Sequence, residues 1–157
     1  MNDPNAFDLF LRTRLVYGCG AVGQLGELAH GLFDKVKEQP VLLVTDPGVA
    51  QAGHAQRGAE ALQEAGFRVS IFEDVRENPT TRDVDRCLTF ASDLQPELIV
   101  GLGGGSSMDV AKGTNFLYSC GGRMQDYWGV GKAGPMLPMI AVPTTAGTPS
   151  SRAMIAA

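Results

Sequence analysis

The feature that most constrains the fold is an alternation of short apolar runs with stretches of helical periodicity. The runs have strand length and are almost uniformly apolar, as strands buried on both faces are. The predicted strands are residues 40–45, 68–72, 97–102 and 139–142, and the predicted helices are about 52–65, 80–94 and 106–118. Strands that alternate with helices through short connections imply parallel pairing and right-handed crossovers. We therefore predict an α/β fold, an open and mostly parallel sheet with helices on both faces.

Polar or glycine-rich loops follow three of the predicted strands. They are Asp46-Pro47-Gly48, the segment from Gly103 to Ser106, and the segment from Thr144 to Thr148. In open parallel sheets ligands bind beyond the carboxyl ends of the strands. These loops are therefore predicted to meet at one edge and to form a single site there.

The first of two competing glycine motifs is Gly18-Cys19-Gly20-Ala21-Val22-Gly23, which matches the G-x-G-x-x-G dinucleotide fingerprint. Asp46 follows at about the distance of a ribose-binding acid. The preceding strand is poor, however, since Arg12-Thr13-Arg14 comes before only three apolar residues, whereas a central strand should be longer. This pattern favours a glycine turn between an edge strand and a helix over a cofactor site.

The second motif, Gly101 to Lys112, follows a strong strand and leads directly into a helix. Glycines let backbone N–H groups approach phosphate oxygens, and a helix N-terminus adds unpaired N–H groups and partial positive charge. The alternative is a plain capping box with Ser106 at the N-cap and Asp109 reaching back. One glycine would suffice for that turn, so the three in a row favour a diphosphate site.

Composition narrows the class of protein. A chain of 157 residues fits one domain, which we take as a single dinucleotide-binding domain over residues 1–157, and its net charge of −4 argues against nucleic-acid and membrane partners. The start of the chain lacks a signal pattern and no apolar run is long enough to span a bilayer, so we expect a cytoplasmic protein. Three widely spaced cysteines and two histidines, His30 and His54, give no pattern of a disulfide framework or a zinc site.

Together these residues resemble the iron-containing (group III) alcohol dehydrogenase family. The family pattern Gly-Gly-Gly-Ser-x-x-Asp-x-Ala-Lys stands here as Gly103–Lys112. Further family landmarks appear in order, and the likeness covers about residues 10–148. They are Thr45-Asp46-Pro47-Gly48, Asn78-Pro79-Thr80, Asp126-Tyr127-Trp128 and the segment from Pro143 to Thr148. The resemblance implies a Rossmann-like domain with an N-terminal edge hairpin, to which the turn at Gly18–Gly23 would belong.

The resemblance also implies a role for each matching residue. Gly103, Gly104, Gly105 and Ser106 would hold the diphosphate of NAD. Asp46 would accept hydrogen bonds from the adenosine ribose and repel a 2′-phosphate, which favours NAD over NADP. Asn78 would lie near the adenine, and Asp109 and Lys112 would either orient the nicotinamide end or cap and flank the helix. Thr144, Thr145 and Thr148 would line the pocket around the phosphates and the nicotinamide ribose.

The sequence departs from the family after Thr148, where Pro149 replaces a glycine and an expected glutamate is missing. The family's metal ligands, one aspartate and three histidines, belong to a C-terminal helical domain that has no counterpart here. Fe²⁺ or Zn²⁺ is thus expected for the full-length family, while this chain carries no catalytic or metal residue. We expect a truncated product, from a frameshift or a separated domain, with a divergent tail over residues 149–157.

Several functions remain open. The first is the NAD-binding half of a metal-dependent alcohol dehydrogenase, which transfers hydride between NAD and a small alcohol or aldehyde and which would be inactive as this chain. The second is a standalone nucleotide-binding or regulatory module that complements a separate catalytic chain. A third function is that of a dehydroquinate-synthase-like or glycerol-dehydrogenase-like enzyme, which the Ser106–Lys112 segment fits less well. An unpaired sheet edge near the end of the chain leads us to expect a homo-oligomer.

Overall fold

A parallel sheet of four strands forms the centre of the chain in the computed structural model, which describes residues 14–129 and 131–145. The strand order is β2-β1-β3-β4. The strands are β1 (Pro40–Val44), β2 (Arg68–Phe72), β3 (Leu98–Gly103) and β4 (Met139–Pro143). Each lies within one residue of its predicted bounds, because a continuous apolar run bounded by turn residues is a strong strand signal. The predicted α/β class is confirmed.

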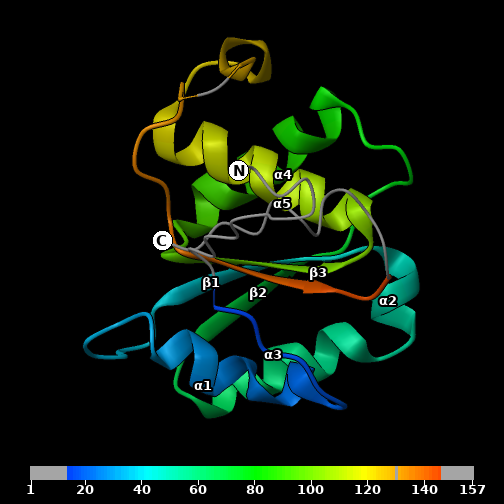
Figure 1. The fold of residues 1–157 in the computed structure, drawn as a ribbon, viewed down its shortest axis with the longest axis vertical. Helices are drawn as coiled ribbons and strands as arrows, with labels where there is room; N and C mark the ends of the chain where they lie inside the picture. Colours follow the sequence, from blue (N-terminus) through cyan, green and yellow to red (C-terminus); the bar gives the residue numbers. More distant parts are fainter. Residues whose placement is uncertain (1–13, 130, 146–157) are drawn as a thin grey trace, which may run out of the picture.

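Helices cover both faces of this sheet (Figure 1). On one face lie α1 (Leu25–His30) and α3 (His54–Glu64), and on the other lie α4 (Thr81–Leu94) and α5 (Gly105–Cys120). The short helix α2 (Pro47–Gln51) follows β1 directly. Two 3₁₀ turns, η1 (Ala21–Gln24) and η2 (Met124–Tyr127), complete the described elements. Among the described residues, no helix is both long and apolar enough to cross a bilayer.

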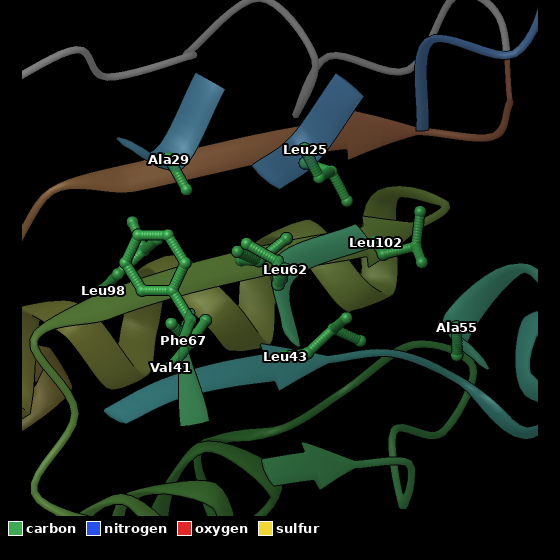
Figure 2. Close-up of a cluster of buried hydrophobic side chains, with 10 residues drawn as sticks. Leu25, Ala29, Val41, Leu43, Ala55, Leu62, Phe67, Leu98 and Leu102 are labelled. Atoms are coloured by element: carbon green, nitrogen blue, oxygen red, sulfur yellow. The ribbon is translucent and has the colours of Figure 1, made fainter. Parts of the chain in front are cut away.

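The strands bury both of their faces, so their side chains divide between two hydrophobic clusters. Val41 and Leu43 of β1 join the cluster beneath α1 and α3, while Leu42 and Val44 join the cluster beneath α4 and α5. All four are fully buried. Figure 2 shows the first cluster, in which Leu25 and Ala29 of α1 point toward the sheet. Burial of each aliphatic side chain contributes roughly 1.5–3 kcal/mol to the free energy of folding. Because both faces of β1 are buried, an apolar residue is favoured at every position, and the strand is a continuous apolar run.

The sheet changes winding direction between β1 and β3. From β1 the chain crosses through α3 to β2 on one side, and it then returns through α4, past β1, to β3 on the other side. The carboxyl ends of β1 and β3 are therefore neighbours whose following loops diverge to opposite faces. Such a topological switch point leaves a crevice where open α/β sheets bind their ligands.

The helix predicted at 52–65 is present as α3, and the short helix α2 lies before it, where a turn was predicted. Gly53 adopts a left-handed conformation with a φ of +79° and separates α2 from α3. Gly66, with a φ of +93°, lies just after α3, where a C-terminal glycine was predicted. Helix α4 also begins as predicted, with Thr80 at its N-cap and the Asp83 carboxylate accepting from the Thr80 backbone N–H at 2.7 Å.

The predicted N-terminal edge hairpin is not formed by the part of its range that the structure describes. Residues 14–17 have no strand conformation, and Leu15 and Tyr17 are 67% and 99% exposed. Residues 1–13, which include the rest of the expected hairpin, lie outside the described residues. The helix predicted after the glycine turn is present as η1 and α1.

Candidate functional site

The loop after β1 is organised by the side chain of Asp46. We predicted a turn at Asp46-Pro47-Gly48, but these residues begin α2, with Asp46 at the N-cap and Pro47 in its first turn. The Val49 backbone N–H donates to Asp46 Oδ1 at 3.0 Å. Proline and aspartate both suit a helix start, because proline lacks the N–H that would go unpaired there and a carboxylate accepts from those that remain. The Asp46 side chain is half-buried at the carboxyl edge of the sheet.

The glycine loop after β3 leads into α5 without an intervening coil. Gly104 is the N-cap, α5 begins at Gly105, and the Met108 N–H donates to the Gly104 carbonyl at 3.2 Å. The N–H groups of the residues before Met108 precede the first intrahelical bond, so helix geometry gives them no partner within α5. Together with the axial dipole of a 16-residue helix, they form an anion-binding end.

The alternative of a capping box at Ser106 is wrong. The helix starts two residues earlier than that box requires, so Ser106 is its second residue and makes no side-chain cap. Asp109 is the fifth residue of α5 and is exposed. Glycine can occupy the N-cap, and here it allows the helix to start close to the strand. This early start moves the side chains of Ser106 and Asp109 away from capping positions.

The Asp46 and glycine loops are joined by a hydrogen bond that sequence reasoning missed. Ser107 is fully buried and its Oγ donates to Asp46 Oδ2 at 3.1 Å. Gly103 lies at this junction with a φ of +148°, and a Cβ there would be 2.4 Å from Ser107 Oγ. No sequence signal connects two residues 61 positions apart, although their loops were predicted to share an edge.

The loop after β4 completes the cluster. The Thr144 backbone N–H donates to the Gly103 carbonyl at 2.8 Å. Thr145 faces the glycine loop, since a Cβ on Gly104 would be 3.6 Å from Thr145 Oγ1. The structure thus brings Asp46, the glycine loop and the two threonines to one edge, as predicted. Thr148 lies outside the described residues.

Helix α5 also fixes the approach to β4. The buried Asn115 side chain donates from Nδ2 to the Leu137 carbonyl at 2.9 Å and accepts the Leu137 N–H at Oδ1. Ser119 Oγ adds a second contact with the Leu137 N–H at 3.2 Å. Since β4 begins two residues later, this clamp sets where the strand lies and hence where Thr144 and Thr145 emerge.

Asn78 stands somewhat apart from this cluster. It is exposed in the loop after β2 and has a left-handed φ of +52°, a conformation that asparagine tolerates better than most residues. Among the described residues, no hydrogen bond joins it to the glycine loop. Arg86 holds the loop at both ends, by pairing with Asp74 and with Asp83, which in turn bonds Thr80. These bonds, from Thr80 first and then from Arg86, lower the pKa of Asp83 to about 2.

Lys112 is the half-buried cation nearest the site along α5. Burial lowers its pKa from the ordinary value, while the negative charge of Asp109 acts in the opposite direction. The lysine lies one helical turn beyond the residue pair Met108-Asp109.

The described residues do not fit a catalytic metal. In residues 14–129 and 131–145, no three His, Cys, Asp or Glu side chains come together as a metal site would require. His30 and His54 are exposed on α1 and α3. The ligand set implied for the family is therefore not assembled by this part of the chain.

The first glycine motif has different surroundings. No strand precedes Gly18 in the described residues, and Gly20 is a left-handed turn residue with a φ of +73°. A Cβ on Gly18, Gly20 or Gly23 would meet no atom within 4 Å. The close contact in this region belongs to Gly26, whose Cβ would lie 2.2 Å from the Ala61 carbonyl oxygen where α1 packs on α3.

Several known proteins resemble this chain in sequence and in fold. Alcohol dehydrogenase 4 of Schizosaccharomyces pombe is 40% identical over 110 residues, which are 69% of this chain and 26% of that protein. A crystal structure of 1,3-propanediol oxidoreductase superposes with a TM-score of 0.77 at 35% identity, over 85% of this chain and 34% of the other. Sulfoacetaldehyde reductase from Bifidobacterium kashiwanohense, solved in complex with NAD⁺, gives 0.69 and 32% over the same shares.

The chain thus spans only about a third of the length of the solved structures that it matches. The family described as iron-containing alcohol dehydrogenase matches residues 12–156, nearly the whole sequence. That match covers the sheet, the switch point and all three loops of the site. The chain belongs to the iron-containing alcohol dehydrogenase family.

Proposed function

We propose that this chain binds NAD at the carboxyl edge of its sheet and forms the cofactor-binding half of a metal-dependent alcohol dehydrogenase. The observation that carries the proposal is the convergence of Asp46, the Gly103–Ser106 loop and Thr144–Thr145 at the switch point between β1 and β3. When bound, NAD accepts or donates the hydride that interconverts an alcohol and an aldehyde. The NAD⁺ complex of the related sulfoacetaldehyde reductase supports this choice of cofactor.

The glycine loop fits a diphosphate for a steric reason. Gly104 has an ordinary φ of −80°, and a Cβ there would contact Thr145 only at van der Waals distance. The protein itself therefore does not require glycine at this position. An approaching phosphate does, because its oxygens must reach backbone N–H groups that a side chain would screen. Gly104, Gly105 and Ser106 would hold the diphosphate at the positive end of α5.

The other residues would orient the two ends of the cofactor. Asp46 would accept from the adenosine ribose hydroxyls, and its charge would oppose the 2′-phosphate of NADP. Asn78 would lie toward the adenine. Thr144, Thr145 and Thr148 would face the phosphates and the nicotinamide ribose, with Asp109 and Lys112 flanking that end.

Titration calorimetry of the purified chain with NAD tests the proposal. We expect saturable binding at or below millimolar cofactor. In NMR spectra recorded during the same titration, we expect amide chemical-shift changes at Gly104–Ser106 and none at Gly18–Gly23. Absence of saturation at millimolar NAD would disprove NAD binding. Shifts confined to Gly18–Gly23 would assign the cofactor to the other glycine motif.

The catalytic activity of this chain alone is measured by an assay of NAD-dependent alcohol oxidation. We expect little or no oxidation of small primary alcohols with NAD, with or without added Fe²⁺ or Zn²⁺, because the described residues do not assemble a metal site. Turnover that depends on added metal would contradict this. Turnover that appears only with a second, His-rich helical chain would favour the complementing-module function.

Two further expectations remain proposals. The homo-oligomer is tested by sedimentation velocity, in which a monomer at all concentrations would exclude it. The cytoplasmic location is tested by fractionation of the source cells, in which recovery of the protein outside the cytoplasm would exclude it.

A further inference from the structure

We propose that Ser107 is a positioning residue that determines cofactor selectivity by fixing the carboxylate of Asp46. The inference rests on the proposed function, since it concerns how the same site distinguishes NAD from NADP. Ser107 lies on α5, whereas Asp46 follows β1, and their hydrogen bond is 3.1 Å long. Ser107 would act through Asp46 and not by touching the cofactor.

The two oxygens of Asp46 are tied to two different helices. Oδ1 accepts the Val49 N–H of α2 at 3.0 Å, and Oδ2 accepts the Ser107 hydroxyl of α5 at 3.1 Å. A carboxylate held through one oxygen can still turn about its side-chain bonds, whereas one held through both cannot without breaking a bond. The plane of this carboxylate is therefore set by the fold before any ligand arrives.

The bond to Ser107 is built into the core of the loop. Ser107 is fully buried, so its hydroxyl has no access to bulk water and depends on protein partners. The bond also requires Gly103, because a Cβ there would lie 2.4 Å from Ser107 Oγ and 2.8 Å from Asp46 Oδ2. A main chain without a side chain at this point is what lets the hydroxyl and the carboxylate meet.

The fixed orientation of the Asp46 carboxylate affects which of the two cofactors, NAD or NADP, the site would accept. An ionised carboxylate offers about four acceptor positions, and the protein donors use two of them, which leaves others for the two hydroxyls of a ribose. A 2′-phosphate would meet a negative charge that cannot turn away. Rejection of NADP then depends on the rigidity of Asp46 as well as on its charge.

The test is calorimetric titration of the full chain with NAD and with NADP, for wild type, Ser107→Ala, Ser107→Cys and Asp46→Ser. Serine is a good N-cap, so Asp46→Ser removes the charge while retaining the start of α2. In Ser107→Ala we expect the ratio of the NADP to the NAD dissociation constant to fall by about 3- to 10-fold, the range expected for one hydrogen bond. Ser107→Cys, which retains the volume with a weak donor, should fall between wild type and Ser107→Ala.

Two controls separate positioning from general packing. In the Asp46→Ser background, adding Ser107→Ala should leave the NADP to NAD ratio unchanged. Ser92→Ala removes an exposed α4 hydroxyl that bonds only its own helix, and it should leave the ratio of the wild type. Thermal unfolding of each variant verifies that it is folded at the titration temperature.

The outcomes distinguish this inference from the function on which it rests. If the wild type binds NAD and Ser107→Ala weakens both cofactors equally, or changes neither, Ser107 is structural and the inference is overturned. It is overturned as well if Ser107→Ala shifts the ratio in the Asp46→Ser background. If the wild type saturates with neither cofactor, the proposed function fails first and this inference fails with it.

Discussion

The two glycine motifs contain similar letters but differ in what surrounds them. Gly18–Gly23 matches the dinucleotide fingerprint, yet a Cβ at any of its glycines would meet open space. In the second motif, a Cβ on Gly101 would lie 3.1 Å from Ala111 Cβ, and one on Gly103 would overlap Ser107 and Asp46. The first motif is a turn on the surface, whereas the second lies where a buried strand, a helix and a neighbouring loop meet.

The difference shows that a glycine pattern acquires meaning from the strand before it. Strand β3 is fully buried and delivers its glycines to the switch point, whereas no strand precedes Gly18 in the described residues. In a dinucleotide site, one glycine allows a turn, one admits the phosphate and one allows close helix packing. In the second motif, Gly103 allows the turn and Gly101 allows the close packing of α5. We propose that Gly104 admits the phosphate.

Gly103→Ala should have the largest effect. The new Cβ would overlap two polar side chains, and the φ of +148° disfavours any residue except glycine. We expect a loss of about 2–5 kcal/mol in the free energy of unfolding, measured by urea denaturation. NAD binding should be lost as well, because Asp46 and the loop move together. A variant as stable as wild type would show that this junction is not packed as described.

Gly104→Ala should separate binding from folding. Its Cβ has room against Thr145 and its φ is ordinary, so stability should change by less than about 1 kcal/mol. If the diphosphate binds as proposed, the methyl group would lie in its path, so the NAD dissociation constant should rise at least about tenfold. Gly18→Ala is the matched control, and its NAD affinity should equal that of wild type. If Gly104→Ala and Gly18→Ala bind NAD equally well, the proposal that the diphosphate binds against Gly104 is contradicted.

The fold could be predicted almost completely from local pattern. Strands of uniform apolar residues are buried on both faces, and the alternation with helices admits few topologies. The clearest failures were local and had physical causes. The turn predicted at Asp46-Pro47-Gly48 instead begins α2, because an aspartate at the N-cap and a proline after it suit a helix start. Residues 14–17 of the expected edge hairpin have no strand conformation.

The site was predictable in its loops but not in its contacts. Thr144 and Asp46 were placed correctly because the carboxyl ends of parallel strands must share an edge. The contact between Ser107 and Asp46 could not be foreseen, since it depends on α5 starting at Gly105 and so turning Ser107 inward. A shift of two residues in the start of a helix determines which serine bonds the Asp46 loop and which lies in the first turn of α5 without that contact.

Gly20→Ala and Gly23→Ala should have the smallest effects and test the first motif directly. Gly20 has a left-handed φ of +73° but touches nothing, so alanine there should cost about 1 kcal/mol in unfolding free energy from backbone strain alone. Gly23 lies in η1 with open space around it, so alanine there should change stability by less than about 0.5 kcal/mol. Calorimetry should give both variants the NAD affinity of wild type. The fold of Gly23→Ala has no reason to change. A weaker NAD affinity in this variant would therefore indicate that the cofactor binds at Gly18–Gly23, the motif that matches the dinucleotide fingerprint.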